Sequence, residues 1–218
     1  MSNRRLYLRA AEDLRDNPGQ WAAYNASGHC VVLAGPGSGK TKTLTIKMAR
    51  MLAEDVAEPR GIACITYNNE CAKELEQRLD QLGVEPGGRV FVGTVHSFSL
   101  TQILLPYAKT ARLGLPEGFT VASQSEHRDA LERAVRRTID DSRNPQEWNF
   151  GMGRYRRSFL DRSVPQWSTT DPQLAQLVEA YEAELRMKGL IDFDDMPLLA
   201  VRALRDNCLL YTSDAADE

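Results

Sequence analysis

A glycine-rich stretch between residues 31 and 41 carries the residue types that phosphate binding requires. Glycines let the backbone curl so that successive N–H groups point inward at an anion, and a helix that begins at the loop adds the positive end of its dipole. In such a loop the lysine reaches the β- and γ-phosphates, and the hydroxyl of the next residue ligates Mg²⁺. The stretch reads Val31-Val32-Leu33-Ala34-Gly35-Pro36-Gly37-Ser38-Gly39-Lys40-Thr41.

These residues predict a site for Mg²⁺-ATP. We expect the backbone from Ala34 to Thr41 to hold the phosphates, with Lys40 and Thr41 as the catalytic side chains and Thr41 as the metal ligand. Val31 to Leu33 are expected to form a buried parallel strand, followed by a helix from Lys40. The pattern is imperfect, because Ala34 stands where the standard loop has glycine. An ordinary glycine turn is the alternative, and the relaxed pattern arises by chance in roughly one chain in a hundred of this length.

Gln20 is a second candidate for the nucleotide. It lies fifteen residues before Gly35, at the start of a predicted helix that follows the turn Asn17-Pro18-Gly19. A glutamine that folds back over the loop can donate to and accept from an adenine edge through its amide. The alternative is an ordinary surface residue.

Two further apolar runs predict a parallel sheet and therefore an α/β fold. Ile62–Thr66 and Val90–Val92 read as strands, and the helix predicted between them, Glu70 to Leu82, gives the spacing of a βαβ unit. Open α/β sheets bind ligands at the carboxyl ends of their strands. We expect a ligand edge there, and no catalysis by His96, because no second acid or base lies nearby. The segments at that edge are Tyr67-Asn68-Asn69 and Gly93-Thr94-Val95-His96-Ser97-Phe98.

The chain changes character after about Leu100, where helices and loops replace the strand–helix alternation. Helices are predicted at 100–111, 125–141, 153–163 and 172–188. Arginines crowd this region, and a solvated helix face is favoured over a nucleic-acid surface. The alternative is that Arg154, Tyr155, Arg156 and Arg157 contact a phosphate backbone. The arginines are Arg128, Arg133, Arg136, Arg137, Arg143, Arg154, Arg156, Arg157 and Arg162.

An acidic segment near residue 192 invites assignment as a magnesium site at a strand end, which we reject. Only two apolar residues precede Asp192, too few for a buried strand. We expect instead a helix whose first turn holds Asp194, Asp195 and Pro197.

Composition limits the class of protein. The 218 residues include 27 Lys and Arg against 30 Asp and Glu, which says little about partners. The chain has no run of eighteen apolar residues, and its N-terminus lacks an apolar signal core, so we expect a cytoplasmic protein without a membrane span. Cys30, Cys64 and Cys71 lack metal-type spacing and are expected to be buried free thiols.

Residues 208–218 need separate treatment, because they resemble the translation of a transposase adapter used to build sequencing libraries. Our hypothesis is that the reading frame leaves genuine coding sequence near Asn207, so that this tail is an adapter-derived scar. A native acidic tail is the alternative.

Five motifs in order make the chain resemble the N-terminal part of a UvrD/Rep-type superfamily 1 DNA helicase. Gln20 is similar to the family's adenine-recognising glutamine, and Ala34 to Thr41 to its AGxGSGKT loop. Thr66-Tyr67-Asn68-Asn69 resembles motif Ia, and Gly93–Phe98 resembles GTxHSF. Ile191–Met196 resembles the IDFxDLL segment. The sequence departs from these motifs at Asp16, Lys42, Asn68 and Glu70, and the negative charge of Glu70 argues against a phosphate contact there.

The resemblance implies a RecA-like P-loop subdomain 1A whose first part is residues 1–99. It implies a helical insertion, subdomain 1B, at 100–189, and a return segment at 190–207, with 208–218 as the tail. It also implies ATP and Mg²⁺ as cofactors and single-stranded DNA as partner, with translocation along one strand in the 3′ to 5′ sense driven by ATP hydrolysis; protein partners are unknown. DNA would stack on Tyr67 or Phe98 and meet polar contacts from Thr66, Asn69, Thr94 and His96.

The family's DExQ segment, whose Asp holds Mg²⁺ and whose Glu polarises water, does not occur in this sequence. The second RecA-like domain and its arginine fingers, worth about 10³ to 10⁵ in rate in related enzymes, would also lie beyond Asn207. We therefore expect the intact gene to encode an ATP-dependent helicase and this chain to bind nucleotide with negligible hydrolysis. Two alternatives remain: a helicase–nuclease subunit, or a nucleotide-binding module that does not translocate.

Overall fold

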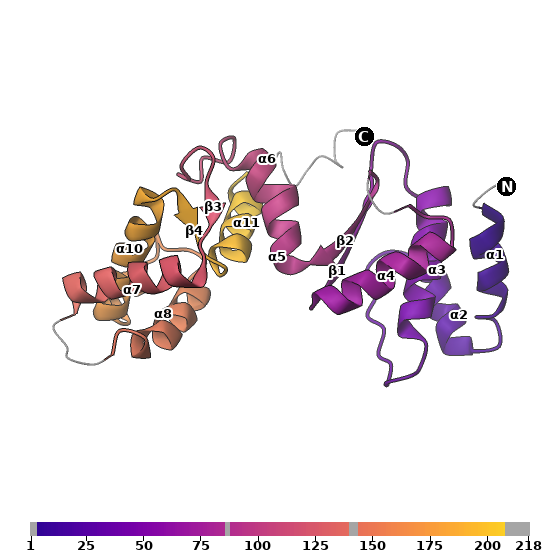
Figure 1. The fold of residues 1–218 in the computed structure, drawn as a ribbon. Coiled ribbons are helices and arrows are strands. Elements are labelled where there is room, and N and C mark those ends of the chain that lie inside the picture. The colour runs from indigo at the N-terminus through magenta and orange to yellow at the C-terminus, as the bar shows by residue number, and fades with distance from the viewer. Residues whose placement is uncertain (1–3, 86–87, 140–143, 208–218) are drawn as a thin grey trace. The chain divides into compact units, whose positions relative to one another are not determined.

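The computed structural model describes residues 4–85, 88–139 and 144–207, and its internal contacts divide the chain into two units (Figure 1). Unit 1 ends at Phe98, and unit 2 begins at Ser99. Helices dominate both units, and each holds one small parallel sheet of two strands. The predicted tail at 208–218 lies outside the described residues.

Unit 1 contains a βαβ arrangement at its centre. Its helices and strands are α1 (Arg4–Glu12), α2 (Pro18–Asn25), α3 (Lys40–Glu54), β1 (Ile62–Thr66), α4 (Asn69–Gln81), β2 (Val90–Thr94) and α5 (Val95–Phe98). Strands β1 and β2 run parallel and are joined through α4, with Ile62 paired to Val90 and Thr66 to Thr94. The two strands and their connecting helix confirm the predicted mixed architecture with a parallel pair.

Two apolar clusters hold unit 1 together. The first packs α3 and α4 against the β1–β2 pair, with Leu79 fully buried. The second joins α1, α2 and α3 through Ala11, Tyr24 and Ile46, which are all at most 5% exposed. The phosphate loop connects α2 to α3, so the second cluster fixes the two helices on either side of it.

The predicted strand Val31–Leu33 is wrong, because these residues form no strand in the structure. Their side chains are 87%, 52% and 92% exposed. A strand needs a neighbour that pairs with its backbone, and among the described residues β1 pairs only with β2. The apolar run therefore leads into the loop as exposed chain outside any helix or strand.

Unit 2 is built around helices α7 and α10. Its elements are a π-helical turn, η1 (Ser99–Leu104), α6 (Leu105–Tyr107), β3 (Thr120–Val121), α7 (Gln124–Thr138), α8 (Glu147–Ser158), α9 (Gln166–Thr169), α10 (Pro172–Met187), β4 (Leu190–Ile191) and α11 (Asp195–Asp206). Its main core contains Leu131, Leu177, Val178, Tyr181 and Leu185, each fully buried. Strands β3 and β4 form a short parallel pair.

Two further expectations need correction. Leu190 and Ile191 do form a buried strand, although it is only two residues long, because β3 pairs with it. Cys30 and Cys71 are exposed, and Cys64 is buried as expected; all three are free thiols. Among the described residues, no helix is long and apolar enough to cross a membrane.

Candidate nucleotide-binding site

The phosphate loop owes its shape to glycines in the left-handed region. Gly37 and Gly39 have φ angles of 73° and 80°, which other residues rarely adopt. Gly39 is the N-cap of α3, and a Cβ built there would lie 2.6 Å from Nε2 of Gln20. The left-handed backbone therefore requires glycine at this position, and a larger residue would also displace the Gln20 amide.

Lys40 is the first residue of α3, and its side chain is exposed over the loop. Its ammonium donates to the carbonyl oxygens of Ala34 at 2.7 Å and Gly35 at 2.6 Å. The Ser38 hydroxyl donates to the same Gly35 oxygen at 2.7 Å. The Lys40 ammonium thus contacts uncharged backbone carbonyl groups of the loop and, among the described residues, no carboxylate.

Thr41 follows Lys40 in the first turn of α3 and is half-buried. No side chain caps this end of the helix. The first N–H groups of a helix lack partners within it and carry the positive end of its dipole. Ala34 and Pro36 are exposed beside this end. The arrangement offers an anion backbone donors, an ammonium and a hydroxyl on one short segment.

Gln20 comes to the loop from α2. The Asn17 side chain caps this helix by accepting from the N–H groups of Gly19 and Gln20, each at 3.1 Å. The Gln20 amide then donates through Nε2 to the carbonyl oxygen of Ser38 at 2.8 Å. The structure therefore brings Gln20, predicted from the sequence as a nucleotide contact, against the loop.

The carboxyl ends of β1 and β2 lie at one edge, because Thr66 is paired in register with Thr94. Tyr67 follows β1 and is 97% exposed, and Asn69 is exposed at the start of α4. Asn68 caps α4 by accepting from the Cys71 N–H at 2.8 Å. This cap assigns Asn68 a structural role.

The second segment of that edge is held more tightly. Thr94 Oγ1 accepts from the Ser97 N–H at 3.2 Å. His96 is half-buried, and the Phe98 ring packs edge-on against Phe91 with centroids 5.3 Å apart. A Cβ at Gly93 would lie 2.7 Å from the Phe91 ring, so glycine there makes room for this pair.

Comparison with known proteins points to the same family as these motifs. The family model described as the UvrD/REP helicase N-terminal domain matches residues 16–216. The chain belongs to the UvrD/Rep helicase family. It is 30% identical over 200 residues to the ATP-dependent DNA helicase Rep of Escherichia coli K12, covering 89% of this chain and 29% of Rep.

Other members of the helicase family match over a similar span. DNA helicase II of Rickettsia typhi is 30% identical over 184 residues, covering 81% of this chain and 28% of the relative. The ATP-dependent DNA helicase PcrA of Staphylococcus aureus Mu50 is 24% identical over 185 residues, covering 83% and 25%. The chain therefore spans less than a third of the length of these helicases.

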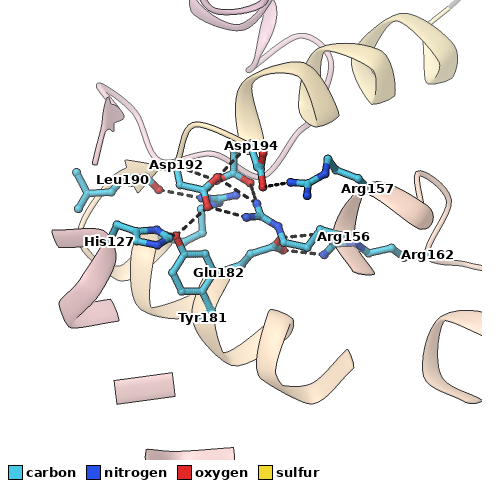
Figure 2. A network of polar contacts seen from close by, with 11 residues as sticks. His127, Arg156, Arg157, Arg162, Tyr181, Glu182, Leu190, Asp192 and Asp194 are labelled. Carbon is cyan, nitrogen blue, oxygen red and sulfur yellow. Dashed lines mark hydrogen bonds and ion pairs between the residues drawn. The ribbon is translucent and has the colours of Figure 1, made fainter. Parts of the chain in front are cut away.

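The arginine-rich part of this helicase-family chain is not simply a solvated face. Figure 2 shows Arg156 at the centre of a buried polar network that joins α8, α10 and the segment after β4. Arg156 is 1% exposed, and Tyr155 beside it is 6% exposed. These two residues cannot contact a phosphate backbone, whereas Arg154 and Arg157 are exposed.

Three carboxylates surround the Arg156 guanidinium. It donates to Asp192 at 2.6 and 3.2 Å and to Asp195 at 2.6 Å. Its Nε lies 3.0 Å from Glu182 as an ion pair, although the N–H is not aimed well enough for a hydrogen bond. Arg162 holds Glu182 through two contacts of 2.7 Å.

The same network ties down the start of α11. The backbone N–H of Asp192 donates to Asp195 Oδ2 at 3.0 Å, and that of Asp195 donates to Asp192 Oδ1 at 2.7 Å. Arg186 donates to Asp195 at 2.8 Å, and the Tyr181 hydroxyl donates to Asp192 at 2.8 Å. His127 lies 2.6 Å from that hydroxyl. Asp192 and Asp195 are therefore structural anchors.

The network shifts its members' pKa values in opposite directions. Burial opposes the charge of Asp192, but Arg156 and the Tyr181 hydrogen bond outweigh burial and lower the Asp192 pKa. Burial likewise opposes the charge of Glu182, but Arg162 and Arg156 lower its pKa. Burial and the neighbouring charge of Asp192 raise the pKa of Asp195. The first protonation on acidification of this pair therefore falls on Asp195.

A cleft of about 480 Å³ borders the network within unit 2. Its arginines, Arg162, Arg202 and Arg205 among them, are paired with carboxylates. We place the candidate nucleotide site at the loop because of its backbone geometry and charge. The cleft is a weaker candidate, because its arginines are already neutralised by carboxylates and would attract a phosphate only weakly.

The sequence contains a pattern that indicates burial of Arg156, although a count of charges does not reveal it. Met152, Tyr155, Arg156 and Phe159 recur at the spacing of a single helix face. An arginine inside an apolar stripe must be buried with its counter-charges. The paired acids Asp192 and Asp195 supply them.

Proposed function

We propose that this chain is the ATP-binding part of an ATP-dependent DNA helicase that acts in the cytoplasm and moves 3′ to 5′ along single-stranded DNA. One arrangement carries the proposal: Lys40 and Thr41 begin a 15-residue helix directly behind a left-handed glycine, and Gln20 lies against the same loop. The names of Rep and PcrA, both ATP-dependent DNA helicases, support this assignment.

The domain organisation follows from the same proposal. Unit 1 would be the first part of a RecA-like subdomain, and residues 100–189 a helical insertion. Residues 190–207 would lead back to the sheet. In unit 1 the parallel strand pair β1–β2 and its crossover helix α4 support this proposal, although Val31–Leu33, directly before the loop, forms no strand.

The loop residues fit a magnesium-bound adenosine triphosphate. Lys40 now contacts two neutral carbonyl oxygens, and charged phosphate oxygens are stronger acceptors for an ammonium. The uncapped end of α3 supplies N–H donors, and Thr41 supplies a hydroxyl ligand. Bound Mg²⁺ would neutralise charge on the phosphates. Gln20 would exchange its loop contact for the adenine edge.

The edge formed by Thr66 and Thr94 is the proposed path of single-stranded DNA. Tyr67 is the better stacking residue, because it is 97% exposed while Phe98 packs on Phe91. Thr66, Asn69, Thr94 and His96 would supply polar contacts along the strand.

We infer that the 218-residue chain binds nucleotide without appreciable turnover. The described residues contain no group of three His, Cys, Asp or Glu side chains placed to hold a metal ion. No DExQ segment occurs in the sequence. In the family pattern the water-polarising glutamate comes from that segment, so this sequence does not supply it.

Calorimetric titration of the 218-residue chain with Mg²⁺-ATP tests the proposal. Replacing Lys40 by Ala removes a charged donor and should weaken binding by about tenfold or more. Lys42→Ala is the matched control, since Lys42 lies on the same helix and its ammonium pairs with Asp13 at 3.1 Å; its affinity should stay within about twofold.

Three results would contradict parts of this proposal. Absence of ATP binding by the unmodified chain would remove the nucleotide site, and equal binding by Lys40→Ala would remove the role of the lysine. DNA-stimulated turnover that Lys40→Ala abolishes would disprove the inferred lack of hydrolysis.

A further inference from the structure

Lys47 holds the far end of the helix that carries Gln20. It is half-buried on α3, and its ammonium donates to the carbonyl oxygens of Ala23 at 2.9 Å and Ala26 at 2.6 Å. Ala23 lies in the last turn of α2, and Ala26 is its C-cap. A cation at a helix C-terminus satisfies the last carbonyls and opposes the negative end of the dipole.

Helix α2 is therefore fastened to the loop and its helix at both ends. At the N-terminal end the Gln20 amide donates to Ser38 at 2.8 Å. At the C-terminal end Lys47 binds two carbonyls. Between them, Tyr24 packs against Ile46 in a shared core, and the Arg50 guanidinium lies 4.4 Å from the Tyr24 ring centroid.

These fastenings matter because α2 cannot keep its position alone. It has only 8 residues and begins with Pro18 and Gly19. Helices this short are marginal in water, and apolar packing allows sliding more readily than directed hydrogen bonds do. Lys47 lies about two turns beyond Lys40 on α3, so its contacts set how far along α3 the Gln20 side chain stands.

We propose that Lys47 is a positioning residue for nucleotide recognition. Its hydrogen bonds to α2 fix the register of that helix on α3 and so keep Gln20 beside the loop. This inference rests on the proposed function, in which Gln20 reads the adenine edge. Lys47 itself touches neither the phosphates nor the base; it acts on selectivity between bases.

The test is the affinity of the 218-residue chain for Mg²⁺-ATP and Mg²⁺-GTP, measured by calorimetry. Lys47→Met keeps the apolar stem and removes the ammonium. It should weaken ATP binding by about tenfold and GTP binding by less than about twofold, because the triphosphate contacts remain. Lys47→Arg, which keeps a charged donor, should restore the ATP preference.

Gln20→Ala supplies the decisive comparison. Alone it should lose the ATP preference to the same degree, and combining it with Lys47→Met should produce no further loss, because the two changes act through one contact. A purely structural lysine would instead lower the melting temperature and weaken both nucleotides equally. Lys42→Met, on the same helix, should change neither.

Each outcome decides between the two proposals. If unmodified chain binds ATP through Lys40 but Lys47→Met keeps the ATP-to-GTP ratio, the positioning role is wrong and the nucleotide site stands. If the unmodified chain binds neither nucleotide, the proposed function fails and this inference with it. Should Lys47→Met not fold, Lys47→Gln, with one neutral donor, must show a partial loss of the same ratio; an unchanged ratio overturns the inference.

Discussion

Lys40 and Arg156 are both cations with several short contacts, yet they belong to opposite kinds of site. Lys40 is exposed and contacts two backbone carbonyls at 2.6 and 2.7 Å. Arg156 is 1% exposed and contacts three carboxylates. The first cation keeps its net charge for an incoming anion. The second is neutralised inside the fold.

The difference shows which charged residues can bind a ligand. An ammonium on neutral, exposed carbonyls can exchange them for phosphate oxygens at little cost. When a buried guanidinium moves away from its carboxylates, the carboxylates remain buried without a counter-charge, and this costs several kcal/mol of folding free energy. We therefore propose the nucleotide site in the weakly held loop of unit 1, whereas the strongly held network of unit 2 maintains structure.

The largest effect expected from this comparison is on stability at Arg156. Arg156→Met leaves Asp192, Asp195 and Glu182 buried without their common cation, and should lower the free energy of unfolding of unit 2 by about 3–5 kcal/mol. Urea unfolding followed by tryptophan fluorescence measures it. In a Trp21→Phe background, the signal comes from Trp148 and Trp167, which both lie in unit 2.

Arg157→Met is the matched control for that experiment. Arg157 is the next residue, but its side chain is 51% exposed and pairs with Asp194 at 2.7 Å. The expected loss is about 0–1 kcal/mol. Equal losses for the two variants would mean that burial does not distinguish them, and loss of ATP binding in Arg156→Met with unit 2 still folded would contradict the separation of the two roles.

Motif chemistry located the loop from the sequence because that chemistry is local. Gly39, Lys40 and Thr41 are consecutive in the chain, and the glycines before Lys40 indicate the left-handed turn that the loop needs. The network could not be read in the same way. Arg156 and Asp192 are thirty-six residues apart in the chain, and a count of charges does not reveal which of many arginines points inward.

A substitution in the nucleotide loop should reduce stability less than Arg156→Met does. Gly39→Ala places a side chain at φ 80°, which costs about 1–2 kcal/mol, and its Cβ would lie 2.6 Å from the Gln20 amide. The amide must move and lose its bond to Ser38. We expect unit 1 to be destabilised by about that amount and ATP binding to weaken, measured by urea unfolding followed at Trp21 and by calorimetry.

Gly28→Ala separates the two causes. Gly28 has a φ of 66°, but a Cβ there meets nothing within 4 Å. It should therefore cost similar backbone strain without affecting nucleotide affinity. If Gly28→Ala weakens ATP binding as much as Gly39→Ala, the contact with Gln20 is not what makes glycine necessary at the loop.

The wrong strand at Val31–Leu33 has a different origin from the hidden arginine. Three apolar residues before a glycine loop have the composition of a strand, and Ile62–Thr66 with similar composition does form one. The difference is the neighbour: β1 has β2 beside it, and residues 31–33 have no paired strand among the described residues. Strand formation depends on a partner that local sequence does not name.

The smallest effect distinguishing the two regions is the pH dependence of the network. The pKa values of Asp192 and Glu182 are lowered in the folded state, so their contribution to stability is complete above the ordinary carboxyl pKa, about 4, and is lost as the pH falls through the lowered values. The raised pKa of Asp195 acts in the opposite direction, because protonation relieves its buried charge. Because protonation of Asp192 and Glu182 would leave Arg156 and Arg162 without their counter-charges, we expect a net loss of unit 2 stability below about pH 4.

Urea unfolding of the Trp21→Phe chain between pH 7 and pH 3 measures this dependence, and Arg162→Met isolates one part of it. Arg162 holds Glu182 through two hydrogen bonds of 2.7 Å. Removing Arg162 should bring the Glu182 pKa back toward its ordinary value, so the free energy of unfolding of unit 2 should fall less steeply as the pH is lowered. The nucleotide loop, residues 34–41, offers no such carboxylate. Unit 2 stability that rises from pH 5 to pH 3 would instead show that protonation of Asp195 outweighs the losses at Asp192 and Glu182, and would contradict the expected net loss.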